Sequence, residues 1–321
     1  MDKKNLTALD DVIISTIKGY GWQTIKNYAV SLAESGFKGR KVILACDLTS
    51  VAREALTKLG FELYDYTSTA GNTVYERFRV LQEWCAKQTD VRFIIHCDGR
   101  DVVIQRDPSP YMEKQTTKIW GASEFILYRD EFCNPEWIRK LYGEDTLKTL
   151  LNEEVICAGT IAGEFETFKR MIARIYESCT DRFGDDQAAL NVLLRTEFKD
   201  VMSIPRYEDG FIATIGWYLI GYANGNAEQF VGRRSLIVPT PPRLEDGVYY
   251  PFNQAEPFCI IHQYDRGYSK IPIISARYKC PFNVPDDTLA VKAAVKRKRG
   301  GPIKYAADGL TVDWFDQHDI G

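Results

Sequence analysis

The chain has 321 residues, of which 45% are hydrophobic and 26% are charged, and its formal net charge at pH 7 is -3. These values are ordinary for a globular protein, and the length suffices for one large domain or two smaller ones. The slightly negative charge excludes a general attraction to nucleic acid or anionic membranes, so any electrostatic partner must be bound by a local patch.

Cysteine usage and hydropathy predict a cytoplasmic protein. The eight cysteines are scattered, and none forms a CxxC or CxxH pair. Several lie in apolar runs, which favours buried thiols in a reducing compartment over a zinc site or a disulfide framework. No stretch approaches the roughly 18 consecutive apolar residues of a membrane span, and the first eleven residues lack the apolar core of a signal peptide.

Strands and helices alternate through the first hundred residues. Apolar runs predict strands at 11–17, 41–46, 61–66 and 93–95, and helical spacing predicts helices at about 22–35, 50–59 and 74–85. Such alternation is typical of βαβ crossovers and a mostly parallel sheet. The first strand is followed by KGYGW, which is not GxGxxG, and the chain contains no GxxxxGK[ST]. Any phosphate group must therefore be bound in a different way from that used by dinucleotide-binding and P-loop sites.

The second half is less regular. The pattern predicts a strand at 117–125, an apolar glycine-containing segment at 154–163, and helices at about 134–143, 165–175 and 183–194. Beyond residue 201, short strands and turns predict an antiparallel addition. The expected fold is α/β, with a Rossmann-type, mostly parallel central sheet flanked by helices.

Carboxylates gather after the fourth predicted strand. The segment VRFIIHCDGRDVVIQRDP places Asp98, Asp101 and Asp107 after an apolar run. Open α/β sheets bind ligands at the carboxyl ends of strands, and neighbouring carboxylates repel one another unless a cation neutralises them. A metal-bound phosphate site is one interpretation, and helix caps or turns are the other. Both stay open for Asp98 and Asp101, whereas a turn is preferred for Asp107, which precedes a proline.

A histidine ends a later apolar run. His262 is one of only three histidines in the chain. A lone histidine is more often a hydrogen-bonded core residue than a ligand, but His262 stands at a strand end as Asp98 and Asp101 do. Two carboxylates and one imidazole suit Mn²⁺, or Mg²⁺, with positions left for phosphate oxygens. Arg266 and Lys270, in the following loop, would balance diphosphate charge.

Four segments together resemble metal-dependent nucleotide-sugar glycosyltransferases of the GT-A fold, especially glycosyltransferase family 8. HCDGRDVVIQRDP is similar to the DxD motif, CAGTIAG to NxGxxxG, DDQAALN to DQxxLN, and HQYDRGYSK to HxxGxxK. Each motif alone is weak, and the resemblance rests on their order and spacing across most of the chain, from Asp11 to Lys270.

The resemblance implies roles for matching positions. Asp101 would bind the metal that bridges the donor diphosphate, and His262 would be the late metal ligand. Asp186 and Gln187 would lie near the transferred sugar, with Gln187 close to the anomeric carbon in retaining members. A plain helix-dipole role for Asp186, in the first turn of its predicted helix, stays open.

Three further positions take donor-binding roles from the resemblance. Arg77, on the helix before the DxD-like segment, would contact the donor. Lys270 would contact the diphosphate. Gly159 would lie beside the sugar or the acceptor.

The sequence departs from the family pattern at its first carboxylate. The first DxD position falls on Gly99, and the extra carboxylate is Asp98. Residues three apart converge only through a turn, which Gly99 makes feasible. Asp98 is expected either to join Asp101 on the metal, or to hold the donor ribose or orient Arg100. The late motif is also two residues longer than the family's.

The resemblance implies an enzyme of the hexosyltransferase type. It would move a sugar from a nucleotide-diphosphate donor, with a UDP-sugar favoured, to a glycan, a lipid-linked acceptor or a protein. Retention is the better interpretation, since no strong nucleophile is evident. A metal-dependent nucleotidyltransferase or phosphohydrolase is one alternative, and a sugar-nucleotide-binding protein of the same fold without turnover is the other.

We expect one catalytic domain over residues 1–285, with a donor-binding half at about 11–110 and an acceptor-side half at 111–285. Residues 286–321 form a basic tail, whose positive charges cluster at 292–299. This run is open to three interpretations: a solvated surface, a dock for an anionic acceptor or a membrane, or a flexible lid over the diphosphate. Nucleic-acid binding is not expected.

Overall fold

The computed structural model describes residues 6–69, 73–223 and 236–288. Its centre is a seven-stranded sheet in the order β3-β2-β1-β4-β7-β6-β8. The strands are β1 (Val12–Lys18), β2 (Arg40–Cys46), β3 (Phe61–Asp65), β4 (Phe93–Cys97), β6 (Ile119–Leu127), β7 (Glu154–Glu164) and β8 (Met202–Ser203). Neighbouring strands run parallel, except that β7 is antiparallel to both β4 and β6. The predicted mostly parallel α/β sheet is confirmed.

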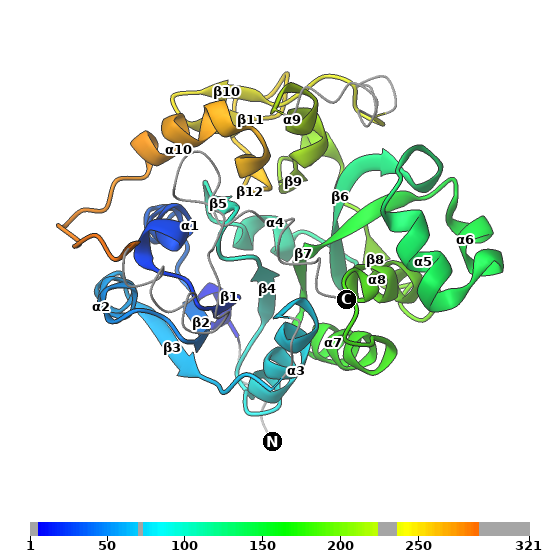
Figure 1. Ribbon diagram of the computed structural model, residues 1–321, viewed down its shortest axis with the longest axis horizontal. Helices are drawn as coiled ribbons and strands as arrows, with labels where there is room; N and C mark the ends of the chain where they lie inside the picture. Colours follow the sequence, from blue (N-terminus) through cyan, green and yellow to red (C-terminus); the bar gives the residue numbers. More distant parts are fainter. Residues whose placement is uncertain (1–5, 70–72, 224–235, 289–321) are drawn as a thin grey trace, which may run out of the picture.

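Helices flank this sheet (Figure 1). They are α1 (Trp22–Glu34), α2 (Ser50–Lys58), α3 (Thr73–Cys85), α4 (Ser109–Glu113), α5 (Asn134–Tyr142), α6 (Glu144–Leu150), α7 (Phe165–Ser178), α8 (Asp185–Arg195), α9 (Gly216–Ala223) and α10 (Ile271–Arg277). Helices were predicted from the sequence at α1, α2, α3, α5, α7 and α8. The pattern missed α4, α6, α9 and α10.

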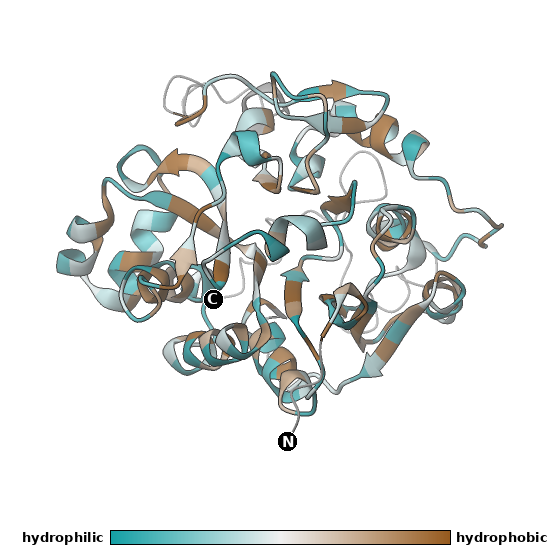
Figure 2. Ribbon diagram, turned by 180° about the vertical axis from the view of Figure 1, so that it is seen from behind, coloured by the Kyte–Doolittle hydropathy of each residue, from teal (hydrophilic) through white to brown (hydrophobic). Residues whose placement is uncertain are grey.

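The sheet is buried on both faces. On β1, Ile13 and Ile17 pack with side chains of α1 and α2, whereas Val12 and Ile14 pack with α3, α7 and α8. A strand covered by helices on both sides reads as a continuous apolar run instead of an alternating one. Figure 2 shows hydrophobic stretches on the central strands, while the surrounding helices carry both hydrophilic and hydrophobic stretches.

Shorter strands form separate sheets beside the central one. Their bounds are β5 (Val102–Ile104), β9 (Ile212–Thr214), β10 (Arg243–Glu245), β11 (Val248–Tyr250) and β12 (Ile260–His262). β12 pairs antiparallel with β5 and parallel with β9, and β10 and β11 form an antiparallel hairpin. The expected antiparallel addition is therefore present, but it includes one parallel pair and does not extend the central sheet. Figure 1 shows β10, β11, α9 and α10 gathered together.

The chain still contacts the domain beyond residue 285. The carboxylate of Asp287 is buried and accepts hydrogen bonds from the backbone N–H of Trp22, at 2.7 Å, and from the hydroxyl of Thr49, at 2.5 Å. The two donors stand at the first turn of α1 and at the N-cap of α2. The predicted basic run at 292–299 lies outside the described residues. Within the described ranges, none of the helices is long and apolar enough to span a membrane.

Candidate functional site

Three residues predicted as metal ligands lie together at one end of β4. Asp98, Asp101 and His262 each offer a ligand atom, and these atoms all lie within 4.8 Å of one another. Asp98 follows β4, Asp101 precedes β5, and His262 ends β12. The pairing of β12 with β5 places His262 opposite Val102, the residue after Asp101. We call these three residues the metal triad.

The imidazole of His262 faces both carboxylates without bonding to either. Its Nε2 lies 3.6 Å from Asp98 Oδ2 and 3.6 Å from Asp101 Oδ1, which is beyond the usual range for a hydrogen bond. Within the described residues this buried nitrogen has no hydrogen-bond partner. A buried polar atom left unpaired is costly, whereas a cation between the three groups would satisfy all of them. The residues therefore fit a divalent ion.

Burial and the neighbouring charged groups shift the pKa values of the triad residues in opposite directions. Burial alone would raise the pKa of Asp101, but His262 and nearby arginines lower it well below its usual range. Burial would likewise raise the pKa of Asp98, which Arg77 lowers. For His262, burial lowers the pKa, but Cys157 and Asp101 raise it well above its ordinary value. The neighbouring charges thus favour ionised carboxylates and a positively charged imidazole.

A close approach to β1 explains why a glycine occupies position 99, between the two carboxylates of the triad. A Cβ on Gly99 would lie 2.6 Å from Cδ1 of Ile17 on β1, so the first DxD position faces the core and not the triad. Asp98 reaches the triad from one position earlier because the chain bends over residues 99–101. Asp107, in contrast, accepts a hydrogen bond from the backbone of Ser109 at 2.9 Å, as expected for a turn.

Gly159 lies beneath the metal triad, in the middle of β7. A Cβ at this position would lie 2.3 Å from Cε1 of His262 and 2.7 Å from Oδ2 of Asp98. The carbonyl of Gly159 also accepts the backbone N–H of Asp98 at 2.8 Å. Only a glycine allows the imidazole and the carboxylate to approach the strand this closely.

Arg77 joins the triad to the start of α8. Its Nη1 lies 2.7 Å from Asp98 Oδ1 and its Nη2 lies 2.5 Å from Asp186 Oδ2, and the guanidinium is largely buried. Asp186 is therefore more than a dipole partner for its helix. The local turn is served instead by Asp185, which accepts hydrogen bonds from the backbone and hydroxyl of Thr180.

Two more arginines lie beside Asp101. Nη2 of Arg100 is 3.5 Å from Asp101 and 3.1 Å from Asp265, while Nη2 of Arg266 is 3.4 Å from Asp101. Asp265 also binds Arg266 at 2.7 Å and was missed in the sequence, although it directly precedes a predicted site residue. Lys270 lies in a short 3-10 turn, and within the described chain its ammonium group makes no hydrogen bond or ion pair with the triad.

Gln187 is held by three protein groups. Its Oε1 accepts the backbone N–H of Ala158 at 3.0 Å, and its Nε2 donates to Asn134 at 2.7 Å and to Glu124 at 3.0 Å. Glu124 also accepts the indole N–H of Trp217 at 3.0 Å. Burial raises the pKa of Glu124. Sequence reasoning missed this residue, which lies near the end of a mostly apolar predicted strand and in none of the four motif-like segments.

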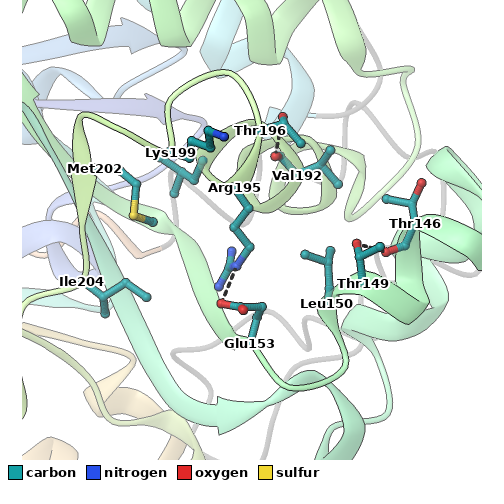
Figure 3. A pocket seen from close by; sticks show the side chains of 11 residues that line it. Thr146, Thr149, Leu150, Glu153, Val192, Arg195, Thr196, Lys199, Met202 and Ile204 are labelled. Carbon is teal, nitrogen blue, oxygen red and sulfur yellow. Dashed lines mark hydrogen bonds and ion pairs between the residues drawn. The ribbon is translucent and has the colours of Figure 1, made fainter.

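A separate pocket of about 360 Å³ lies at the opposite end of α8 (Figure 3). Arg195 projects into it and donates to Glu153 at 3.3 Å, while its Nη1 donates to the carbonyl of Asn191 at 3.1 Å. Arg195 lies nine positions after Asp186 on α8, which corresponds to roughly 14 Å along the helix. The pocket is therefore not part of the site built around the triad.

The structure is similar to solved glycosyltransferases. The galactosyltransferase LgtC, in complex with donor and acceptor sugar analogues, matches with a TM-score of 0.51 and 12% identity over 87% of this chain and 99% of LgtC. The bifunctional glycosyltransferase WbbM matches with a TM-score of 0.53 and 10% identity over 91% of this chain, which spans about half (52%) of that protein. No family model matches the sequence, and no curated protein sequence does. The chain has the GT-A fold, as predicted.

Proposed function

We propose that the protein is a metal-dependent glycosyltransferase of the hexosyltransferase type. It transfers a sugar from a nucleotide-diphosphate donor, with a UDP-sugar favoured, to a hydroxyl on a glycan, a lipid-linked acceptor or a protein. One observation carries the proposal: within a GT-A fold, the orphaned Nε2 of His262 faces the carboxylates of Asp98 and Asp101.

The donor set of the metal triad suits Mn²⁺ or Mg²⁺. Such a cation would neutralise charge on the leaving nucleoside diphosphate. Asp101 and His262 hold it, and Asp98 adds a carboxylate oxygen from its place beside Arg77. Arg100 and Arg266 supply positive charge for the diphosphate oxygens, because a guanidinium binds phosphate through paired donors. Lys270 is a further candidate for the diphosphate.

Asp186 and Gln187 are proposed to face the transferred sugar. One LgtC structure is of an active-site mutant in which a glutamine is replaced by glutamate, and Gln187 is the matching candidate by motif. Three protein groups fix the Gln187 amide, so its Oε1 is presented in one orientation. A neutral amide is a poor nucleophile, which favours front-face displacement with retention. Arg77 orients Asp186, and Gly159 lets the side chains of His262 and Asp98 approach β7, beside the proposed donor position.

The remaining partners are proposed from chemistry and sequence. A carbohydrate-containing acceptor agrees with the donor and acceptor analogues bound to LgtC. A cytoplasmic location, peripheral membrane contact through the basic run at 292–299, and the lack of a nucleic-acid partner follow from the sequence alone.

Donor binding is tested by a thermal-shift screen of UDP-, GDP- and CMP-sugars with and without Mn²⁺. We expect one nucleotide class to raise the melting temperature only when Mn²⁺ is present. The variant Asp101→Asn should lose this shift. Asp107→Asn is the matched control, because Asp107 lies in the same segment but binds the backbone of Ser109. Loss of the shift in both variants, or in neither, would contradict the site.

Turnover separates the proposed activity from its alternatives. A glycosyltransferase releases free nucleoside diphosphate only when an acceptor sugar is present, and Asp101→Asn should abolish this release. Pyrophosphate released from a nucleoside triphosphate would instead identify a nucleotidyltransferase or phosphohydrolase. Mn²⁺-dependent donor binding with neither hydrolysis nor transfer, across a broad acceptor panel, would identify a binding protein.

A further inference from the structure

Cys157 lies against the metal triad without belonging to it. Its sulfur is 3.5 Å from Nδ1 of His262, the ring nitrogen that faces away from the carboxylates. The side-chain amide of Gln263 also donates to the sulfur at 3.9 Å. Cys157 and Gly159 are two residues apart on β7 and so face the same side. The imidazole of His262 therefore lies along the strand, with Nδ1 over Cys157 and Cε1 over Gly159.

This contact bears on the position of the imidazole proton. A neutral histidine carries a proton on one ring nitrogen and a lone pair on the other. For Nε2 of His262 to bind a cation, Nδ1 must keep its proton and needs an acceptor for it. The sulfur of Cys157 is placed to be that acceptor, because it lies 3.5 Å from Nδ1.

The thiol also reaches the sugar side of the proposed site. Burial and the nearby carboxylate of Glu124 raise the pKa of the Cys157 thiol, and Glu124 in turn accepts Nε2–H of Gln187. Cys157 thus lies between His262 and the buried network that fixes Gln187.

We propose that Cys157 is a positioning residue whose sulfur accepts Nδ1–H of His262 and so fixes the tautomer that presents Nε2 to the cation. This inference rests on the proposed function, because it assumes that the triad binds a metal. A cysteine that merely fills space in the core would have no influence on the affinity for a metal.

The test is Mn²⁺ binding alone, followed by the electron paramagnetic resonance signal of the free ion during titration. We expect Cys157→Ala to weaken Mn²⁺ binding about 10- to 100-fold. Cys157→Ser, which restores a donor and an acceptor, should recover most of the affinity. The matched control is Cys85→Ala, since Cys85 is also buried but lies at the end of α3, in a core cluster that includes side chains of α3 and α7. Wild-type affinity in Cys157→Ala, or equal weakening in the alanine and serine variants, would overturn the inference.

A second measurement uses the wild-type protein, so it does not depend on whether a Cys157 variant folds. The chain has three histidines, so nitrogen NMR of protein labelled at histidine can resolve each ring. With diamagnetic Mg²⁺ at saturation, His262 should be protonated at Nδ1, and a proton on Nε2 would contradict the inference. If His262→Ala and Asp101→Asn bind Mn²⁺ as wild type does, the metal site itself is wrong. If they lose Mn²⁺ while Cys157→Ala keeps it, only the role of Cys157 fails.

Discussion

Asp98 and Asp186 bind the two terminal nitrogens of one guanidinium, that of Arg77, at 2.7 and 2.5 Å. The first carboxylate belongs to the metal triad and the second to the first turn of α8. One buried arginine therefore sets the distance between the proposed metal position and the proposed sugar position.

Replacing Arg77 with methionine leaves the buried carboxylate of Asp186 and the half-buried carboxylate of Asp98 without their cation. We expect the free energy of unfolding to fall by about 3–5 kcal/mol, measured by urea denaturation. Adding Asp186→Asn to Arg77→Met should recover part of this loss. The control is Arg53→Met, which breaks an exposed pair with Asp65 and should cost less than about 1 kcal/mol. Equal costs for the two arginines would show that the buried pairs do not stabilise the fold.

Gly159→Ala should separate the metal triad. The new methyl group would overlap the imidazole of His262 and the carboxylate of Asp98. We expect Mn²⁺ affinity to fall at least about tenfold. Gly163→Ala on the same strand is the matched control, because its methyl would meet Ile119 at 2.6 Å, away from the triad. If both variants keep their affinity for Mn²⁺, the crowding at Gly159 does not govern the site.

His96 should make the fold sensitive to acid. It is buried on β4, neither ring nitrogen has a hydrogen-bond partner in the described chain, and burial together with Arg77 lowers its pKa to about 3. The unfolded chain has a histidine pKa near the ordinary value of about 6.5. Between these two values the unfolded state binds more protons than the folded state, so stability falls as pH falls.

The variant His96→Leu removes this titration. Between pH 7 and pH 4.5, wild type should lose about 3 kcal/mol more unfolding free energy than His96→Leu does. The measurement is urea denaturation at both pH values. Parallel losses in the two proteins would mean that His96 is not the group responsible.

Asp287→Ala tests whether the fold includes residues beyond 285. The substitution removes the acceptor for the N–H of Trp22 and the hydroxyl of Thr49. A lost helix-terminus acceptor costs about 1–2 kcal/mol, which a thermal melt detects. Asp286→Ala is the control, because Asp286 is exposed and should change stability by less than about 0.5 kcal/mol. An unchanged melting temperature in both variants would place the domain boundary earlier.

The regular parts of the fold were predictable because their patterns are local. Buried strands of the parallel sheet appear as apolar runs, and amphipathic helices repeat every three to four residues. Helix α9 was missed because GWYLIGYA is apolar on all sides, so no polar face reveals its period. The separate β5-β12-β9 sheet could not be predicted, since it pairs strands that lie far apart in the sequence.

The same distinction holds for the candidate site: residues in local motifs were predictable, and residues placed by distant contacts were not. Asp101 and His262 stand at recognisable strand ends, so the sequence predicted that they would lie close together. Asp98 was left open because its approach depends on a bend beside Gly99, which a motif cannot show. Glu124 lies in no motif, and Cys157 stands where the NxGxxxG pattern has asparagine. The contacts of both residues arise from neighbours contributed by other strands and helices.

The register of β12 against β5 governs when the three residues of the metal triad first come together. His262 lies opposite Val102, so the third ligand arrives only after about 160 further residues have been synthesised. A nascent chain that ends before β12 has both carboxylates and no imidazole, and a one-residue slip of β12 would turn His262 to the opposite face. Binding of the proposed cation would therefore be a late event in assembly, and it would report that the two halves of the chain have joined correctly.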